Sequence, residues 1–383
     1  MISVRGAPMI ISMLTVALLS AAAAHASPRM VSDARFQAAL EDIREQSVPR
    51  MRRVVDDGKA GAGDILQRRL KAAAARGISS SVSIIDYNEK KEVAGSYGSG
   101  VILSESGLII TNNHVASKMS SPWVVLGDNR RIKASVVGLD PESDLALIKV
   151  STHGLSPEAW RPAVWHQGAL ETGDFVIAVG SPWQLSATVT WGIVSAVNRG
   201  GLELNAVGNF IQHSAPINPG NSGGGLFLLR LETDDKGENG ELVGINSAMF
   251  SDTKANSGVG MAIPASVALD VAHDLAAHGK ITRRGGLGID VSDIGFEEQM
   301  RLGVYGGVRI GSVKDGKSGA AAGLEPGDII TAIGDIPVER ASHFRSIVLG
   351  MRPNTTVSIT IKRGGAIKIV PVVVGSRKPL NGH

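Results

Sequence analysis

The stretch Ile217-Asn-Pro-Gly-Asn-Ser-Gly-Gly-Gly-Leu226 places a single hydroxyl, that of Ser222, among glycines. A serine becomes a nucleophile only when a base removes its proton and hydrogen-bond donors stabilise the resulting oxyanion. Glycines permit a sharp turn that directs backbone N–H groups at one point, because they lack a Cβ. The stretch therefore predicts either the nucleophile loop of an enzyme or a plain turn between two strands.

The composition limits what else the chain can be. Its 383 residues are 43% hydrophobic, which suits globular domains. The 39 Lys and Arg residues against 36 Asp and Glu give a net charge of only +3, and the charges are interspersed, so no nucleic acid is expected as a partner. The 47 glycines favour many short strands and turns. The absence of cysteine excludes disulfides, thiolate metal sites and thiol catalysis.

The first 26 residues have the pattern of a secretory signal peptide. Arg5 precedes an apolar run from Met9 to Ala24, and Ala24-His25-Ala26 forms a small-x-small exit. We expect cleavage after Ala26 and export, most simply to the periplasm, with an uncleaved membrane anchor as the alternative. Residues 27–78 show helical spacing, which predicts a helical N-terminal extension of no assigned role.

Residues 79–279 are predicted to form a β-rich domain that contains two further candidate residues. Short apolar stretches alternate with turn signals there, which is typical of antiparallel barrels or sandwiches. His114 follows one such stretch and Asp144 precedes another. An imidazole base needs a carboxylate to fix its tautomer and to stabilise its cation. Either residue by itself is more often structural, but the order His114, Asp144, Ser222 predicts a catalytic triad.

Several motifs in this order resemble the HtrA (Deg) family of trypsin-like serine proteases with a single C-terminal PDZ domain. They are Gly98-Ser-Gly-Val101, Thr111-Asn-Asn-His-Val115, Asp140-Pro-Glu-Ser-Asp-Leu-Ala-Leu147, Asn218-Pro-Gly-Asn-Ser-Gly-Gly224, Gly258-Val-Gly-Met-Ala-Ile-Pro264, Gly286-Leu-Gly-Ile289 and Gly323-Leu-Glu-Pro-Gly-Asp-Ile-Ile330. The resemblance implies a mostly β fold, with a pair of six-stranded β-barrels at 79–279 and an α+β PDZ domain at 283–378.

The resemblance also implies roles for individual residues. Ser222 would be the nucleophile, His114 the general base and Asp144 the carboxylate that orients His114. The backbone N–H groups of Gly220, Asn221 and Ser222 would form the oxyanion hole. Peptide bonds would be hydrolysed through an acyl-enzyme, and no metal or organic cofactor is implied.

The implied binding residues fall into two groups. Ile217 matches the position that shapes the S1 pocket, Ser247 and Ala248 the strand that pairs with substrate, and Phe250 the pocket wall. No acidic residue is present there, so we expect small or medium aliphatic side chains at P1; ordinary packing is the alternative for Ile217 and Phe250. In the PDZ domain, one loop would hold a peptide carboxylate and one helix would line its side-chain pocket, or only fill the core. The residues of that loop and helix are Leu287, Gly288, Ile289, Phe344, Ile347 and Val348.

The chain departs from the family pattern at two places near the nucleophile. His213-Ser214-Ala215 stands where relatives carry Thr-Asp-Ala, and Gly225 stands where they carry Pro. We expect His213 at the surface. The departures put loop stability and regulation in question more than the chemistry.

As a whole, the resemblance implies an exported, ATP-independent endopeptidase that acts on unfolded or misfolded proteins. It also implies peptide C-termini as ligands of the PDZ domain and assembly as homo-trimers or multiples of trimers. A non-catalytic chaperone or scaffold and a peptide-sensing adaptor are the alternatives. A metal hydrolase is disfavoured, because the sequence contains no HExxH pattern.

Overall fold

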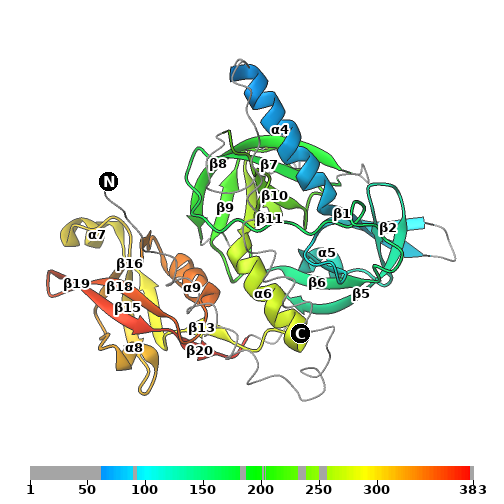
Figure 1. Cartoon of the computed structure of the whole chain (residues 1–383). Helices are drawn as coiled ribbons and strands as arrows, with labels where there is room; N and C mark the ends of the chain where they lie inside the picture. Colours follow the sequence, from blue (N-terminus) through cyan, green and yellow to red (C-terminus); the bar gives the residue numbers. More distant parts are fainter. Residues whose placement is uncertain are drawn as a thin grey trace, which may run out of the picture.

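The computed structural model describes residues 62–88, 93–181, 187–200, 202, 204–231, 239–249 and 257–379. Helix α4 (Ala62–Ser79) comes first, and two closed β-barrels and a smaller α+β domain follow it along the chain (Figure 1). The signal peptide predicted at 1–26, and the part of the predicted extension before α4, lie outside the described residues. Within the described ranges, no helix combines the length and apolar character needed to cross a membrane.

The first barrel has the strand order β1-β2-β3-β6-β5-β4. Its strands and one short helix are β1 (Ser81–Asn88), β2 (Val93–Ile102), β3 (Leu108–Asn112), α5 (Asn113–Ala116), β4 (Pro122–Val125), β5 (Arg131–Asp140) and β6 (Leu145–Val150). Successive side chains of a strand point to opposite faces. Leu108 and Ile110 of β3 accordingly join a core shared with the second barrel, while Ile109 between them fills the first barrel. β3 is therefore buried on both faces, which explains its apolar run Leu108-Ile-Ile110.

The second barrel has the strand order β10-β11-β12-β9-β8-β7. Its elements, with the helix that follows them, are β7 (Phe175–Gly180), β8 (Thr188–Arg199), β9 (Phe210–His213), β10 (Gly225–Leu228), β11 (Leu242–Met249), β12 (Gly260–Pro264) and α6 (Ala265–His278). Val271 and Leu275 of α6 pack in the same core cluster as Leu145 of the first barrel and Phe227 of the second. This shared core fixes the two barrels relative to each other.

The C-terminal α+β domain has its own core. A sheet of order β14-β15-β16-β18-β19, with β17 paired to β16, lies beside the two-stranded sheet β13-β20. The elements are β13 (Arg284–Gly286), β14 (Ile289–Asp293), α7 (Phe296–Leu302), β15 (Val308–Val313), α8 (Ser318–Ala321), β16 (Ile329–Ile333), β17 (Ile336–Pro337), α9 (Ala341–Gly350), β18 (Thr356–Arg363), β19 (Ala366–Val373) and β20 (Gly375–Arg377). The predicted fold class, two six-stranded barrels followed by an α+β domain and preceded by a helix, is confirmed.

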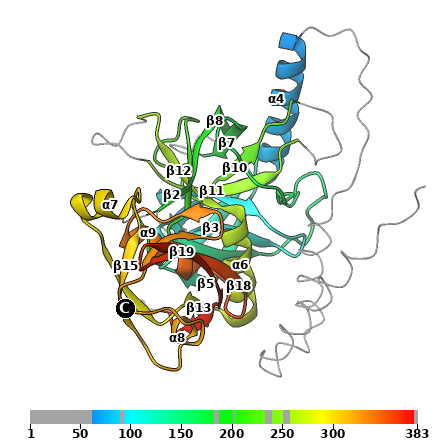
Figure 2. The ribbon, with the colours of Figure 1, turned by 90° about the vertical axis from the view of Figure 1, so that its left-hand side faces the viewer.

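The C-terminal domain packs on the barrels through one side of α9 (Figures 1 and 2). A Cβ added at Gly200, in the loop after β8, would lie 2.4 Å from the His343 ring and 2.8 Å from the Ser346 hydroxyl of α9. At the end of α9, Arg352 pairs with Asp270 of α6. The loop after β8 therefore touches the C-terminal domain directly.

Candidate active site

The pairing of β3 with β6 brings His114 and Asp144 together. Asn112 and Leu145 are opposite each other in this pair, so the residues just beyond them meet at one end of the first barrel. His114 Nδ1 lies 3.0 Å from Oδ1 and 2.8 Å from Oδ2 of Asp144, and the backbone N–H of His114 donates to Oδ1 over 3.0 Å. An Nδ1–H that donates to a carboxylate leaves Nε2 unprotonated, which is the state that a general base requires.

The Asp144 carboxylate is held from the second barrel as well. Asp144 has a left-handed backbone with φ of 58°, a conformation that Asp tolerates better than most residues. Its side chain is 16% exposed, and Ser247 Oγ of β11 donates to Oδ2 over 2.9 Å. We predicted Ser247 from the resemblance as a substrate-binding residue. Its bond to Asp144 had no signal in the sequence, because the two residues lie 103 positions apart.

Ser222 lies in the loop between β9 and β10, where two glycines adopt the left-handed backbone. Gly220 has φ of 103° and Gly223 has φ of 84°. A Cβ at Gly223 would also lie 2.2 Å from the Ser99 carbonyl oxygen, so only glycine fits there. The Gly223 N–H donates to the Asn246 carbonyl over 2.8 Å, which ties the loop to β11.

The Ser222 hydroxyl donates to the carbonyl of Ser247 over 3.3 Å. Among the described residues, no hydrogen bond joins Ser222 Oγ to His114. Because Ser247 also bonds Asp144, the structure brings Ser222, His114 and Asp144 to one site and connects them through Ser247. In enzymes, catalytic hydrogen bonds are often long or poorly aligned until the substrate binds.

The amides predicted for the oxyanion hole differ in their partners. The Asn221 N–H donates to the Asn218 carbonyl over 3.0 Å, so it does not point to an external oxyanion. The N–H groups of Gly220 and Ser222 have no acceptor among the described residues. Ser99 fixes the loop around them, since its hydroxyl donates to the Gly220 carbonyl over 2.7 Å and its N–H to the Ser222 carbonyl over 2.8 Å. The sequence did not indicate this role of Ser99.

Known proteins share the two domains described above. Residues 98–233 match the model of the trypsin-like peptidase domain, and residues 285–374 match that of the PDZ domain. The solved structure of the HtrA-type protease AlgW with a tripeptide is 36% identical, with a TM-score of 0.60 over 82% of this chain and 98% of that chain. The chain belongs to the HtrA family.

Curated relatives in the HtrA family agree with this assignment. The periplasmic pH-dependent serine endoprotease DegQ of Escherichia coli (strain K12) is 37% identical over 271 residues, which is 70% of this chain and 57% of that protein. The periplasmic serine endoprotease DegP of Salmonella typhimurium is 36% identical over 271 residues, which is 70% of this chain and 54% of that protein. The chain thus spans little more than half the length of these relatives.

His213, one of the two departures from the HtrA pattern, is fully buried, so its prediction as a surface residue is wrong. It is 0% exposed on β9, opposite Gly260 of β12. A Cβ at Gly260 would lie 2.5 Å from the His213 ring, so this glycine makes room for it. Burial lowers the pKa of His213 to about 4, against the weaker opposing effects of the Ala215 backbone and the Asn246 side chain. Neither ring nitrogen makes a well-formed hydrogen bond with the residues that the structure describes. His213 is therefore neutral at pH 7.

Gly225 begins β10 and Ile217 lies in the loop before it, and both pack against the core. A Cβ at Gly225 would lie 2.3 Å from the Phe227 ring and 3.0 Å from Leu242 Cδ1. The Phe227 ring therefore fills the space that a side chain at position 225 would need. Ile217 is 4% exposed in a core cluster of the second barrel. Ala248 lies at a bulge of β11, and the predicted pocket residue Phe250 lies outside the described residues.

The residues predicted to bind peptide in the PDZ domain are placed as follows. Leu287 is buried, and Gly288 has φ of 69° in the loop that leads into β14 at Ile289. The three residues predicted on the helix all lie in α9 and are 3–6% exposed in the PDZ core; they are Phe344, Ile347 and Val348.

Ion pairs between the domains hold the turn that carries Asp144. Arg284 of β13 bonds Asp140, and its Nε lies 3.4 Å from Glu142 Oε2. Arg377 of β20 lies 2.9 Å from the same Glu142 oxygen. The Arg284, Asp140 and Glu142 side chains are only 3–7% exposed. Arg284 is 144 positions from Asp140, so no local pattern in the sequence predicts the pair.

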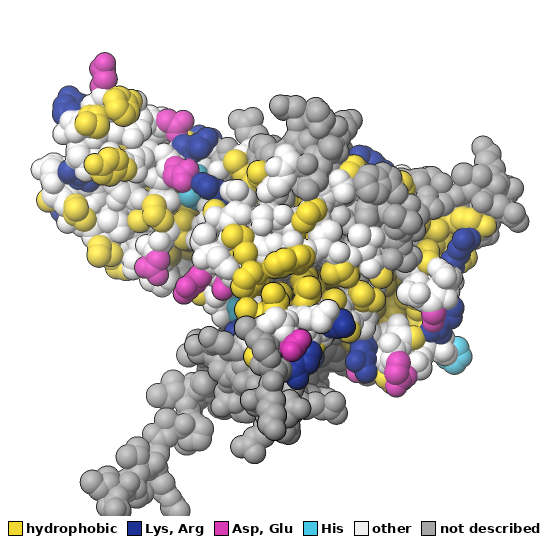
Figure 3. Space-filling view, turned by 90° about the horizontal axis from the view of Figure 1, so that it is seen from above, with side chains coloured by type: hydrophobic (Ala, Val, Ile, Leu, Met, Phe, Trp, Pro, Cys, Tyr) yellow, Lys and Arg dark blue, Asp and Glu magenta, His cyan; other side chains and the backbone are white. Residues whose placement is uncertain are grey.

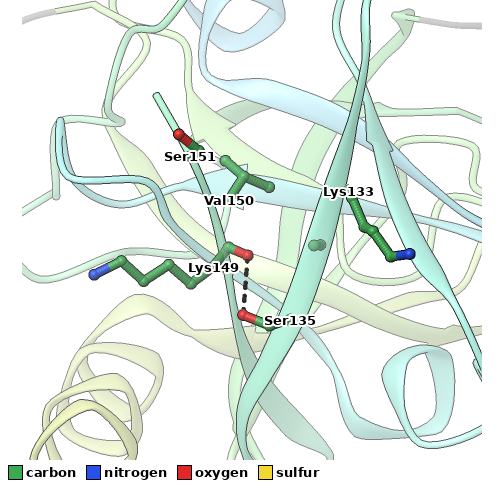
Figure 4. A pocket seen from close by; sticks show the side chains of 6 residues that line it. Lys133, Ser135, Lys149, Val150 and Ser151 are labelled. Carbon is green, nitrogen blue, oxygen red and sulfur yellow. Dashed lines mark hydrogen bonds between the residues drawn. The ribbon is translucent and has the colours of Figure 1, made fainter. Parts of the chain in front are cut away.

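A surface hollow over β5 and β6 contains none of the predicted site residues (Figure 4). It is open and shallow, and its lining includes Lys133, Ser135, Lys149 and Ser151. The candidate active site is therefore defined by its hydrogen bonds rather than by this hollow.

Proposed function

We propose that this chain is a serine endopeptidase that cleaves peptide bonds by acyl transfer. The observation that carries the proposal is the double contact of His114 Nδ1 with Asp144, which leaves Nε2 to act as a base. Ser222 Oγ attacks the substrate carbonyl while His114 takes its proton. His114 then returns the proton to the leaving amine, and water releases the acyl group. General-base catalysis of this kind typically contributes about 10²–10⁴-fold in rate.

The oxyanion of the intermediate is proposed to bind the N–H groups of Gly220 and Ser222. The support is that these amides lack protein acceptors in the described chain, while Asn221 donates within the loop. The mechanism also requires the Ser222 hydroxyl to leave the Ser247 carbonyl, 3.3 Å away, and to reach His114 Nε2. Rotation about the Cα–Cβ bond of Ser222 moves its hydroxyl between staggered positions without moving the loop backbone.

The setting proposed for this activity is quality control in the periplasm, on unfolded or damaged proteins and without ATP. Its support is the family, whose relatives DegQ and DegP are named periplasmic serine endoproteases. We also propose peptide C-termini as PDZ ligands, since AlgW was solved with a tripeptide and with a decapeptide. Control by the PDZ domain is supported by its ion pairs to the Asp144 turn.

A homo-oligomer, as a trimer or a multiple of trimers, completes the proposal. On β8, Trp191 is 49% exposed and Ile193 is 37% exposed. Figure 3 shows hydrophobic side chains gathered in a band on the face seen from above. A continuous exposed apolar patch commonly marks an interaction surface.

The test is cleavage of an unfolded protein by the purified chain. Reduced casein is incubated with the wild type, with Ser222→Ala and with Ser151→Ala, an exposed serine in the hollow of Figure 4. We expect cleavage by the wild type and by Ser151→Ala, after small or medium aliphatic residues, and none by Ser222→Ala. Persistent cleavage by Ser222→Ala would exclude the mechanism. Binding of casein without cleavage by any of the three would instead favour a chaperone.

A further inference from the structure

The outer edge of β14 carries a contact that neither the triad nor the core requires. Arg345 of α9 donates from its guanidinium to the carbonyl of Val291 over 3.2 Å. Val291 stands opposite Ile310 of β15, whose N–H and carbonyl are bonded on the far side, to Asp328 and Gly327. In an antiparallel pair the two opposed residues either bond each other or both point away. Val291 therefore directs its N–H and carbonyl away from β15, towards the outer edge.

This edge is the place where a further strand can add. β14 ends the described sheet, so its outward amide and carbonyl groups have no strand partner there. Peptides that bind by strand addition pair with such groups. In this structure the Val291 carbonyl is taken by Arg345, and α9 is held close to β14 because Asp293 accepts the Ala341 N–H over 2.6 Å. A ligand strand must therefore displace the Arg345 side chain rather than the helix.

Arg345 has a full positive charge but only a neutral partner. In the described part of the chain no ion pair joins it to an acidic side chain, and the residue is exposed. The bond to the Val291 carbonyl is already charge-assisted, but an Arg–carboxylate pair adds the attraction of opposite charges and can form two parallel N–H···O bonds. A displaced guanidinium would thus gain by meeting a carboxylate on the incoming peptide.

We propose that Arg345 covers the β14 edge in the absence of ligand and selects peptides with Asp or Glu at the third residue from a free C-terminus. The proposal rests on the proposed role of the PDZ domain in binding C-termini. If the terminal carboxylate sits at Leu287-Gly288, the last residue lies opposite Ile289. The residue two positions upstream lies opposite Val291, because bonded residues alternate along a strand. The N–H of this ligand residue donates to the Val291 carbonyl, and its side chain pairs with Arg345.

The test uses the full chain with Ser222→Ala, so that peptides are not digested. It is mixed with ten-residue peptides whose last four positions are randomised, and retained peptides are sequenced. We expect Asp and Glu to be enriched about two- to fivefold at the third position from the end, as for an exposed ion pair. Arg345→Gln removes the enrichment, Arg345→Lys keeps it, and Arg345→Glu changes it to Lys and Arg. Arg340→Gln, at an exposed arginine that pairs with Glu339 at the start of the same helix, is the matched control and keeps it.

The possible failures are distinguishable. If amidated peptides are retained as well as free acids and no C-terminal sequence is enriched, the PDZ domain does not bind C-termini, and the proposed function loses that part together with this inference. If C-termini are selected without acidic preference, or if Arg345→Gln keeps that preference, peptide binding stands and the role of Arg345 is overturned.

Discussion

Replacement of His213 by threonine, the residue that the family pattern has at this position, should make the protein less sensitive to acid. The buried imidazole has a pKa of about 4 in the folded state, whereas an exposed histidine titrates near 6.5. As the pH falls below 6.5, the unfolded chain takes up a proton that the folded chain refuses until about pH 4. The free energy of unfolding is therefore not reduced by this titration above pH 6.5, and it falls as the pH is lowered from 6.5 to 4.

The size of this effect follows from the two pKa values. Their difference from 6.5 to about 4 corresponds to about 3 kcal/mol in total. Between pH 7 and pH 5 the loss is about 2 kcal/mol, because most of the unfolded chains but few of the folded ones are protonated at pH 5. For a domain of this size, 2 kcal/mol lowers the melting temperature by roughly 4–8 °C.

The assay is thermal unfolding at pH 7 and pH 5 of Ser222→Ala and of the double variant Ser222→Ala, His213→Thr. The cavity left by the smaller side chain lowers stability at both pH values, so it cancels in the comparison. Burial also lowers the pKa values of His273 and His343, but these residues are present in both chains. The loss on acidification should be smaller by about 2 kcal/mol in the double variant. An equal loss in the two chains would refute the assignment of His213 as a buried neutral imidazole.

Two further substitutions test the contacts around the triad. Ser99→Ala removes the donor to the Gly220 carbonyl, so kcat on a peptide substrate should fall about tenfold with little change in KM; an unchanged kcat would show that the loop holds its shape without Ser99. Arg284→Ala removes the cation that bonds the buried Asp140 carboxylate and lies beside Glu142, and should cost about 3–5 kcal/mol in urea unfolding; a loss below about 1 kcal/mol would mean that water solvates these carboxylates.

The strand-rich fold could be predicted because it leaves local signals, and the candidate residues His114, Asp144 and Ser222 could be named for the same reason. Apolar stretches with turn residues between them indicated the barrels. His114 follows one apolar stretch and Asp144 precedes another, so each was predicted at the end of a strand. These two residues lie 30 positions apart and meet because β3 and β6 are neighbours.

His213 shows how a local signal can be present and still be missed. Its neighbours Gln212 and Ser214 are polar, which is compatible with the surface position that we predicted. Yet Ile211, two residues before it, is buried, and residues two apart share one face of a strand. The alternation therefore placed His213 on the inner face, once β9 was known to lie between β8 and β12. The contacts of Arg284 and Ser247 had no such signal, because they depend on how domains and barrels pack.

The turn from Asp140 to Asp144 connects the PDZ domain to the proposed active site through buried ion pairs. Its carboxylates Asp140 and Glu142 are buried, and a buried charge is tolerated only while it is paired. Their partners Arg284 and Arg377 belong to strands β13 and β20, at the two ends of the PDZ domain. Withdrawal of that domain would remove both arginines from these buried carboxylates, so the turn would have to rearrange or take up water.

The second barrel also donates hydrogen bonds to this turn, from the loop between β8 and β9. The Val207 N–H donates to the Glu142 carbonyl over 2.9 Å, and Asn205 Nδ2 donates to the Ser143 carbonyl over 3.0 Å. The loop between β8 and β9, which contains Asn205 and Val207, also contacts α9. The PDZ domain therefore contacts the Asp144 turn directly through its arginines and indirectly through this loop. Coupling between two sites is reciprocal in free energy. A PDZ ligand that shifted the PDZ domain on these contacts would therefore change the geometry of Asp144, and occupation of the proposed active site would bias the PDZ domain by the same free energy.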